Sequence, residues 1–273
     1  MKNTIAILAF STLFAVSACK KTDSAKQTNV ESNIPPKFSI DSVKVNDSAK
    51  VNNFLTVKYT SKMLVLPDIK DKALLDSIYF QYKGITDFSK KGLQEYLEKD
   101  KNEYFSSIKN DSKGWAADLQ REQTWDSASN MSFKSNNNDF LHIQYLFSSY
   151  EGGAHSNYGF NERVFDLKNN KKLELKDITT MPKADLETLL KKNINKMPSG
   201  TTDSQGQVKN SDMLLVDVIP ANDNFYFDEK NLYFHYSPYE IAAFAAGDII
   251  IPVSWEELKG TLNPQFKERV KIK

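Results

Sequence analysis

The three histidines of the chain carry the side chains that most readily bind metals or transfer protons near neutral pH. They are His142, His155 and His235, and their spacing forms neither a His-Glu-x-x-His pair nor a close set of ligands on one helix. A zinc site would form only if folding brought His155 and His235 to a carboxylate such as Glu151 or Glu240. Because these residue types carry no spacing signature, we predict no metal site, no cofactor and no catalytic residue.

The sequence also contains no recognised motif for other kinds of catalytic site. Cys19 is the one cysteine, and the sequence contains no Gly-x-Ser-x-Gly elbow and no glycine-rich phosphate loop. Acidic side chains suited to glycoside hydrolysis are plentiful on a chain that is 26% charged, so their abundance selects none of them. The sequence therefore favours a protein without enzyme activity, and an enzyme is the alternative.

The segment 150–158, Tyr-Glu-Gly-Gly-Ala-His-Ser-Asn-Tyr, has the most distinctive local chemistry. It separates two β-type runs, and its adjacent glycines indicate an unusual backbone conformation or a close approach of another segment. We interpret it first as a structural joint between strands. A second segment, the turn fixed by Pro238, we also interpret first as structural. The alternative is a binding surface, since loops rich in Tyr, Asn and His on rigid strands often bind ligands. The candidate ligand-binding residues are Tyr150, Glu151, Gly152, Gly153, His155, Tyr158, Tyr239 and Glu240.

Strands and helices must position these segments. Period-two alternation of apolar residues predicts strands at 38–42, 54–59, 127–134, 140–149, 162–167, 172–175, 225–227, 232–236 and 248–253. Helical spacing predicts helices from Pro67 to Gly84, at 89–108, at 182–197 and from Ser254, where a capping box begins. Residues 214–219 fit either a strand or a short helix. His142 lies on the mixed face of its strand, so we expect it to be hydrogen-bonded within a sheet. The predicted fold class is α+β, with antiparallel sheets, packed helices and two α+β subdomains.

The start of the chain has the pattern of a bacterial lipoprotein leader. A positive charge at Lys2 precedes an apolar run at 5–16 and the segment Val16-Ser17-Ala18-Cys19. The run is too short and wrongly flanked for a membrane-spanning helix. The segment resembles a lipobox, in which the cysteine becomes the first residue of the mature chain and carries lipid. We therefore expect a signal peptide at 1–18, lipidation of Cys19 and a membrane link through that lipid.

Composition limits the partners of the mature chain. The sequence has 36 Lys and Arg against 35 Asp and Glu, and removal of 1–18 takes away only Lys2, which leaves 35 of each sign. A neutral chain lacks the basic excess typical of nucleic-acid binding, so we predict no nucleic-acid partner. Residues 19–37 are polar and aperiodic, which predicts a disordered tether. Two domains are then expected, at 38–130 and at 131–273.

Three groups of residues together resemble one protein family. They are Gly152-Gly153-Ala154-His155, the hairpin Phe165-Asp166-Leu167 that leads to 173–178, and the stretch from Pro238-Tyr239-Glu240-Ile241 to Gly247. Over 139–262 the chain is similar to the family called domain of unknown function 3298, the C-terminal domain of the lysozyme-sensing anti-sigma-V factor, which also accompanies some peptidoglycan deacetylases. Residues 38–130 resemble, more faintly, the domain of unknown function 4163. The resemblance implies an α+β fold with no agreed catalytic residues.

The resemblance also sets the functional expectation. The anti-sigma factor needs a cytoplasmic segment and a spanning helix, and the deacetylases need a metal-binding domain. We expect none of these parts here, so we carry over neither sigma-factor inhibition nor deacetylation. We expect a lipid-anchored protein of the cell envelope, at the outer membrane or periplasmic side of a Gram-negative bacterium. Its expected role is the binding of a lysozyme-like protein or of peptidoglycan glycan, without catalysis. The alternatives are a peptidoglycan-modifying enzyme, an accessory to one, or a structural role in envelope assembly.

Overall fold

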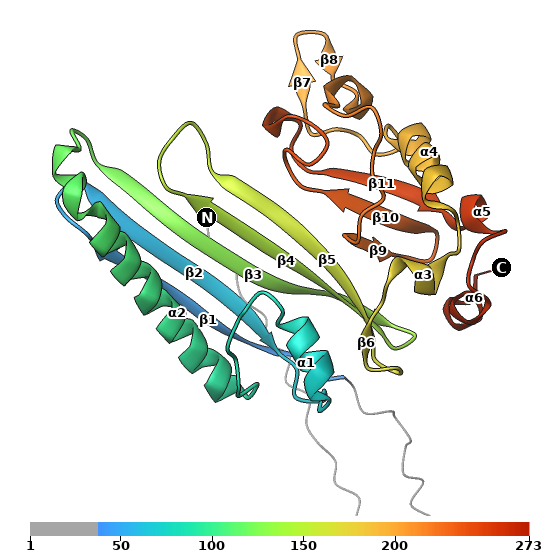
Figure 1. The fold of residues 1–273 in the computed structure, drawn as a ribbon, viewed down its shortest axis with the longest axis horizontal. Coiled ribbons are helices and arrows are strands. Elements are labelled where there is room, and N and C mark those ends of the chain that lie inside the picture. Colours follow the sequence, from blue (N-terminus) through green and yellow to red (C-terminus); the bar gives the residue numbers. More distant parts are fainter. Residues whose placement is uncertain (1–37, 273) are drawn as a thin grey trace, which may run out of the picture. The chain divides into compact units, whose positions relative to one another are not determined.

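A six-stranded sheet keeps the order of its strands along the chain, β1-β2-β3-β4-β5-β6. The computed structural model describes residues 38–272, and Figure 1 shows this sheet from blue to yellow. Its strands are β1 (Asp41–Lys50), β2 (Leu55–Val65), β3 (Gln123–Asn137), β4 (Phe140–Tyr150), β5 (Asn157–Asp166) and β6 (Lys171–Lys172). Neighbours are antiparallel except β2 and β3, which are parallel. A parallel pair needs a long crossover, and the helical segment between these strands supplies it.

Two helices of that crossover, α1 (Lys72–Ile78) and α2 (Lys90–Asp111), pack against the sheet, with α2 on β1 and β2 (Figure 1). The side chain of Asp71 accepts the Leu74 N–H at 2.8 Å, and Ser89 accepts the Gly92 N–H at 3.1 Å, so both helices begin at a capping residue. Two short 3₁₀ turns follow, η1 (Ser112–Gly114) and η2 (Ala116–Asp118). The core between helices and sheet includes Val43, Val45, Met63, Leu74, Ile78, Leu93, Leu97, Met131, Ile143 and Tyr145.

The helix predicted from Pro67 to Gly84 is wrong in length, because α1 ends at Ile78. The aromatic residues beyond that point occupy separate places in the core. Tyr79 stacks on Phe88 with ring centres 5.3 Å apart, and Phe80 packs edge-on against Tyr145. Packing of these rings therefore overrides the helical spacing of the sequence.

The hairpin predicted from 127–134 and 140–149 is confirmed as β3 and β4. Its turn contains Asn138 and Asp139, with φ angles of 53° and 61°, the left-handed backbone that a tight two-residue hairpin turn requires. Both strands extend beyond the predicted bounds. Residue 130, where we expected the first domain to end, lies within β3, so the sheet continues across that position.

A three-stranded antiparallel sheet, in the order β11-β10-β9, belongs to the later part of the chain. Its strands are β9 (Phe225–Phe227), β10 (Asn231–Tyr236) and β11 (Ile249–Ser254), and α4 (Lys183–Asn193) packs on β11. The remaining elements are α3 (Leu175–Ile178), the hairpin β7 (Thr202–Asp203) and β8 (Gly206–Gln207), the 3₁₀ turns η3 (Asn210–Met213) and η4 (Phe244–Ala246), α5 (Trp255–Leu258) and α6 (Pro264–Val270). Leu186, Leu190, Phe234 and Ile251 lie in its core.

Local signals account for most of these later elements. The hairpin at 225–236 and the capping box at Ser254 are confirmed. The helix predicted at 182–197 is present as α4, but it ends earlier than predicted, at Asn193. The strand predicted to reach residue 175 is wrong, because Glu174 forms a capping box that starts α3. Helix α6 was not predicted, although Asn263 caps it and Pro264 stands at its first position. Residues 214–219 form neither a strand nor a helix.

Side chains join the two sheets along the free edge of β5. The Asn224 side chain accepts the Glu162 N–H at 2.5 Å and donates to the Phe160 carbonyl at 3.0 Å. The hydroxyl of Ser237 accepts the Phe160 N–H at 2.9 Å. An unpaired strand edge would otherwise leave these backbone groups to solvent or to another chain. Asn224 and Ser237 therefore take the place of a neighbouring strand and hold β5 beside β10.

The predicted α+β class is confirmed, with sheets that are mostly antiparallel. Residues 38–273 make one compact unit. The predicted signal peptide, Cys19 and the tether lie outside the described residues. Within 38–272 no helix is both long and apolar enough to cross a membrane.

Candidate functional site

The loop between β4 and β5 has the backbone that its glycines suggest. Gly152 and Gly153 have φ angles of +90° and +106°, conformations that side chains rarely adopt. A Cβ at position 152 would lie 3.7 Å from the Trp125 indole nitrogen, and a Cβ at 153 would meet no atom within 4 Å. The expectation of special backbone is confirmed, and backbone conformation rather than crowding is what requires glycine at 153.

His155, at the end of this loop, joins a cluster of aromatic side chains. Its ring stacks on Phe244, with centres 3.7 Å apart and planes 14° from parallel. Tyr158 meets the same Phe244 ring edge-on at 5.7 Å, and Tyr239 lies 5.7 Å from it. We name His155, Tyr158, Tyr239 and Phe244 the aromatic loop cluster. It combines three of the predicted residues with Phe244, which sequence reasoning did not select.

Hydrogen bonds set the orientation of His155 within the cluster. Its Nδ1 lies 3.0 Å from the Ser156 carbonyl, which can only accept, so Nδ1 carries a proton. In the neutral ring Nε2 is then an acceptor, and the Tyr239 hydroxyl donates to it at 3.2 Å. Two loops far apart in the sequence are joined by this bond.

Tyr239 is exposed and has a rare backbone conformation. It is 59% exposed, and its φ of 69° is an outlier for a bulky residue. The turn is closed by hydrogen bonds from Tyr239 N–H to the Ala242 carbonyl and from Glu240 N–H to the Ser237 carbonyl, each 3.1 Å. The interpretation that Tyr239 and Glu240 close a turn is thus correct, and the Tyr239 ring still faces solvent.

The other predicted residues lie apart from the cluster. The Tyr150 hydroxyl donates to the Gly153 carbonyl at 3.1 Å and so stays within its own loop. Glu151 is exposed. Glu240 lines a pocket described below.

The other two histidines belong to a buried network that connects four segments. One Glu162 oxygen lies 2.7 Å from His142 Nε2, and the other lies 2.9 Å from His235 Nδ1 and 2.6 Å from Gln144 Nε2. The second nitrogen of His235 lies 3.1 Å from an Asp248 oxygen. Glu162 and His235 are each 1% exposed. The expectation that His142 is hydrogen-bonded within the sheet is confirmed.

The partners of His235 determine its charge. Both ring nitrogens face carboxylate oxygens, which accept, so both carry protons. Burial disfavours the charged imidazolium, but the hydrogen bonds to Asp248 and Glu162 outweigh it and raise the pKa of His235. Burial likewise opposes ionisation of Glu162, yet hydrogen bonds from His142, His235 and Gln144 lower its pKa to about 2. The hydrogen bond from His235 lowers the pKa of Asp248. The network is an ionised carboxylate–imidazolium–carboxylate chain.

Sequence reasoning missed Glu162 and Asp248, although one signal was present. Glu162 lies on the strand face that also carries Phe160 and Val164, where a lone acidic residue indicates a buried partner. Gln144 of β4 is its direct cross-strand neighbour, and His142 precedes that residue on the same face. The contribution of Asp248 depends on the pairing of β10 with β11 and has no local signature.

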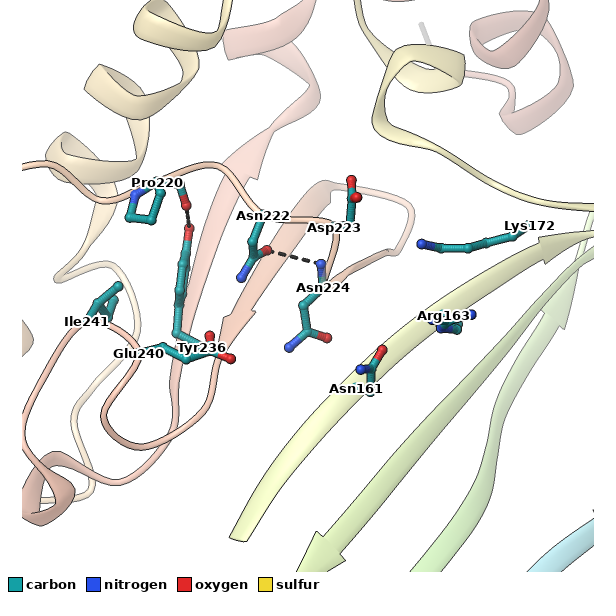
Figure 2. A pocket seen from close by; sticks show the side chains of 10 residues that line it. All are labelled: Asn161, Arg163, Lys172, Pro220, Asn222, Asp223, Asn224, Tyr236, Glu240 and Ile241. Atoms are coloured by element: carbon teal, nitrogen blue, oxygen red, sulfur yellow. Dashed lines mark hydrogen bonds between the residues drawn. The ribbon is translucent and has the colours of Figure 1, made fainter. Parts of the chain in front are cut away.

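A pocket of about 510 Å³ lies beside β5 (Figure 2). Asn161 and Arg163 of β5 and Lys172 of β6 line one side. Asp223 and Glu240 line the other side. Two hydrogen bonds hold that side in place. The Tyr236 hydroxyl donates to the Pro220 carbonyl at 2.8 Å, and the Asn224 N–H donates to the Asn222 side chain at 3.1 Å. The pocket thus has cationic groups on one side and carboxylates on the other.

The zinc arrangement considered from the sequence does not form among these side chains. His155 bonds to Ser156 and Tyr239, whereas His235 bonds to Glu162 and Asp248. In the part of the chain from 38 to 272, no group of three or more His, Cys, Asp or Glu side chains is arranged to hold a metal ion.

Residues 176–256 match the family described as "Protein of unknown function (DUF3298)". The chain therefore contains a DUF3298 domain, and the resemblance expected over 139–262 is confirmed for that part. A crystal structure of a DUF3298-family member from Bacteroides fragilis has a TM-score of 0.64 and 22% identity, covering 85% of this chain and 97% of that one. A DUF3298-family protein from Pseudomonas aeruginosa has a TM-score of 0.52 and 14% identity, covering 84% and 96%. Both similarities concern the fold alone. No curated protein matches the chain.

Proposed function

We propose that the protein is a non-catalytic, lipid-anchored binding module of the bacterial cell envelope, and that its aromatic loop cluster binds a cell-wall glycan. One observation carries the proposal. Tyr239 is 59% exposed, holds a left-handed backbone and is fixed by its hydrogen bond to His155. A bulky residue in that conformation costs on the order of 1–3 kcal/mol, and such strain is concentrated at binding and active sites.

The chemistry of the cluster suits a sugar. Aromatic faces carry partial negative charge, and the C–H groups on one face of a sugar ring carry partial positive charge, so the two stack. Tyr239 offers a ring to solvent beside the stacked pair of His155 and Phe244. Because neighbouring side chains already hold these rings, binding loses little side-chain entropy.

A lysozyme-like hydrolase is the second candidate ligand. Glu151 and Glu240 are exposed on the two loops that carry His155 and Tyr239. Negative charges around exposed aromatic residues complement a positively charged protein and speed its association. The location in the envelope rests on the lipobox-like segment at Cys19 and on the polar segment that follows it.

The replacement Tyr239→Gly tests the role of the cluster. Glycine adopts the positive φ at 239 without strain, so the variant removes the ring and keeps the turn. In calorimetry with the full-length protein and glycan strands freed of their peptides, we expect affinity to fall about tenfold, the loss typical of a tyrosine at the centre of an interface. Phe133→Ala, which removes an exposed aromatic residue from β3, is the control and should leave affinity unchanged.

Three results separate the alternatives. Equal binding by Tyr239→Gly and wild type would rule out the cluster as the site. Binding of lysozyme but not of glycan strands would select the second candidate. Altered muropeptides after incubation of peptidoglycan with the protein would show an enzyme rather than a binding module.

A further inference from the structure

Two cations beside the pocket at β5 lack counter-ions. Within residues 38–272, neither Arg163 nor Lys172 forms an ion pair with a carboxylate, and the buried Nε of Arg163 has no hydrogen-bond partner. The guanidinium carbon of Arg163 lies 3.1 Å from the centre of the Phe80 ring, and its Nη1 reaches the Ser77 carbonyl at 3.4 Å. A positive charge that is partly removed from water and has no counter-ion is unfavourable, so an anionic group bound in the pocket would recover free energy.

Two neighbouring basic residues, by contrast, have counter-ions. Lys171, the neighbour of Lys172 in β6, pairs with Asp177 at 2.7 Å. Arg269 pairs with Asp166 at 2.7 Å. Burial lowers the pKa of Arg163, and burial together with the charge of Arg163 lowers the pKa of Lys172. Both pKa shifts arise because these positive charges are partly removed from water and, within residues 38–272, have no carboxylate within ion-pair distance.

Strand geometry places three donors on one side of the pocket. Asn161 and Arg163 are two residues apart in β5 and share a face, and Lys172 pairs with Phe165, two residues further. Figure 2 shows Asn161, Arg163 and Lys172 along the strands, with Asp223 on the opposite segment. Asp223 attracts both cations at a range longer than an ion pair, and Glu240 lies further along the same side.

We propose that this pocket binds a short peptide by its terminal carboxylate, held by Arg163, Lys172 and Asn161. The amino or amide groups of the same ligand face Asp223 and Glu240. A cavity of about 510 Å³ has the size of a small-molecule site, and guanidinium and ammonium groups form their strongest hydrogen bonds with carboxylates. The residues differ from those of the aromatic loop cluster, so this site does not depend on glycan binding there.

Calorimetry of the full-length protein with the dipeptide alanyl-alanine tests the proposal. We expect binding at millimolar concentration or tighter, and at least about tenfold weaker binding of the dipeptide amide, which lacks the carboxylate. Lys172→Ala should weaken binding of the acid about tenfold and leave that of the amide unchanged. Asn161→Ala should weaken binding of the acid by a smaller factor, because it removes a neutral donor.

Lys171→Ala is the matched control, since it removes the same charge one residue away outside this pocket. It should bind the dipeptide as tightly as wild type. The proposal is overturned if the wild type binds neither ligand, if acid and amide bind equally, or if Lys171→Ala weakens binding as much as Lys172→Ala. The variant Tyr239→Gly should bind the dipeptide normally, which separates a failure here from a failure of the glycan proposal.

Discussion

Gly153 is a residue at which backbone conformation alone requires glycine. Its φ is +106°, and a Cβ would meet no atom within 4 Å. Gly153→Ala should therefore lower the free energy of unfolding by roughly 1–2 kcal/mol through strain, without a steric clash. Urea unfolding followed by circular dichroism measures this loss.

Gly260→Ala is the control for that replacement. Its Cβ would also meet no atom within 4 Å, and its φ lies outside the left-handed range. The change should be neutral or raise stability by about 0.5 kcal/mol through the lower entropy of the unfolded chain. Equal losses at 153 and 260 would show that the loop conformation is not the cause.

Among single residues, those with unusual backbone or chemistry could be predicted from the sequence, whereas the residues that they contact could not. Gly152, Gly153, His155 and Tyr239 could be selected because glycine pairs, histidines and proline-fixed turns are local signals. Phe244 could not, because an apolar residue among alanines has the pattern of ordinary core. Its role follows from the stacking of two loops whose closeness is a property of the fold.

At the scale of elements, the buried network fastens the two sheets together. Glu162 lies on β5, His142 on β4 and His235 on β10, while Asp248 directly precedes β11. The pKa of Glu162 is about 2, below its ordinary 4.5, so its contribution to stability is present above pH 4.5 and is lost as pH falls towards 2. Asp248, whose pKa is also lowered, acts in the same direction.

His235 has the opposite pH dependence. Its pKa is raised above 6.5, so its contribution is fully present below pH 6.5 and is lost as pH rises through the folded-state value. The network as a whole should therefore stabilise the fold most between about pH 4.5 and 6.5.

Glu162→Gln tests this coupling between the sheets. The glutamine amide cannot ionise. The loss of the carboxylate leaves the buried imidazolium of His235 with Asp248 alone, so the free energy of unfolding at pH 6 should fall by about 3 kcal/mol. Below pH 4.5 the gap between variant and wild type should narrow, because Glu162 becomes protonated in the unfolded wild-type chain while it stays ionised in the folded chain until about pH 2. Urea unfolding across pH measures both effects. The control Glu151→Gln changes an exposed carboxylate and should match wild type; a gap for Glu162→Gln that stays constant with pH would contradict the assigned charges.

Prediction of the elements succeeded where the signal is local. Ser89 and Ser254 mark helix starts by side-chain capping, and Asn138 with Asp139 marks the hairpin turn. The parallel pairing of β2 with β3 was not predicted, because it depends on how a crossover of two helices returns to the sheet. The use of Asn224 as a substitute for a strand at the edge of β5 was also missed, since an asparagine in a loop has the pattern of a turn residue.

At the scale of the whole molecule, the six-stranded sheet shows which residues belong to one structural unit. Strand β3 crosses residue 130, and β2 pairs with it along eight positions from Leu55 to Lys62. The similar fold in Bacteroides fragilis covers 85% of this chain, whereas the family match covers 176–256. The structural unit is therefore larger than the matched family segment and includes the first strands of the six-stranded sheet.

The attachment of this unit to a membrane is a prediction from sequence, and Cys19→Ser tests it. Serine has no thiol to carry lipid, so labelled palmitate should no longer enter the protein, and the chain should move from the membrane to the soluble fraction on cell fractionation. The physical reason is that each buried CH₂ of an acyl chain contributes about 0.8 kcal/mol to membrane affinity, and these contributions are lost together. Ser24→Ala, five residues later in the polar segment, is the control and should keep both the label and the membrane location. A Cys19→Ser protein that stays in the membrane fraction would show that another part of the chain, or a bound partner, provides the attachment.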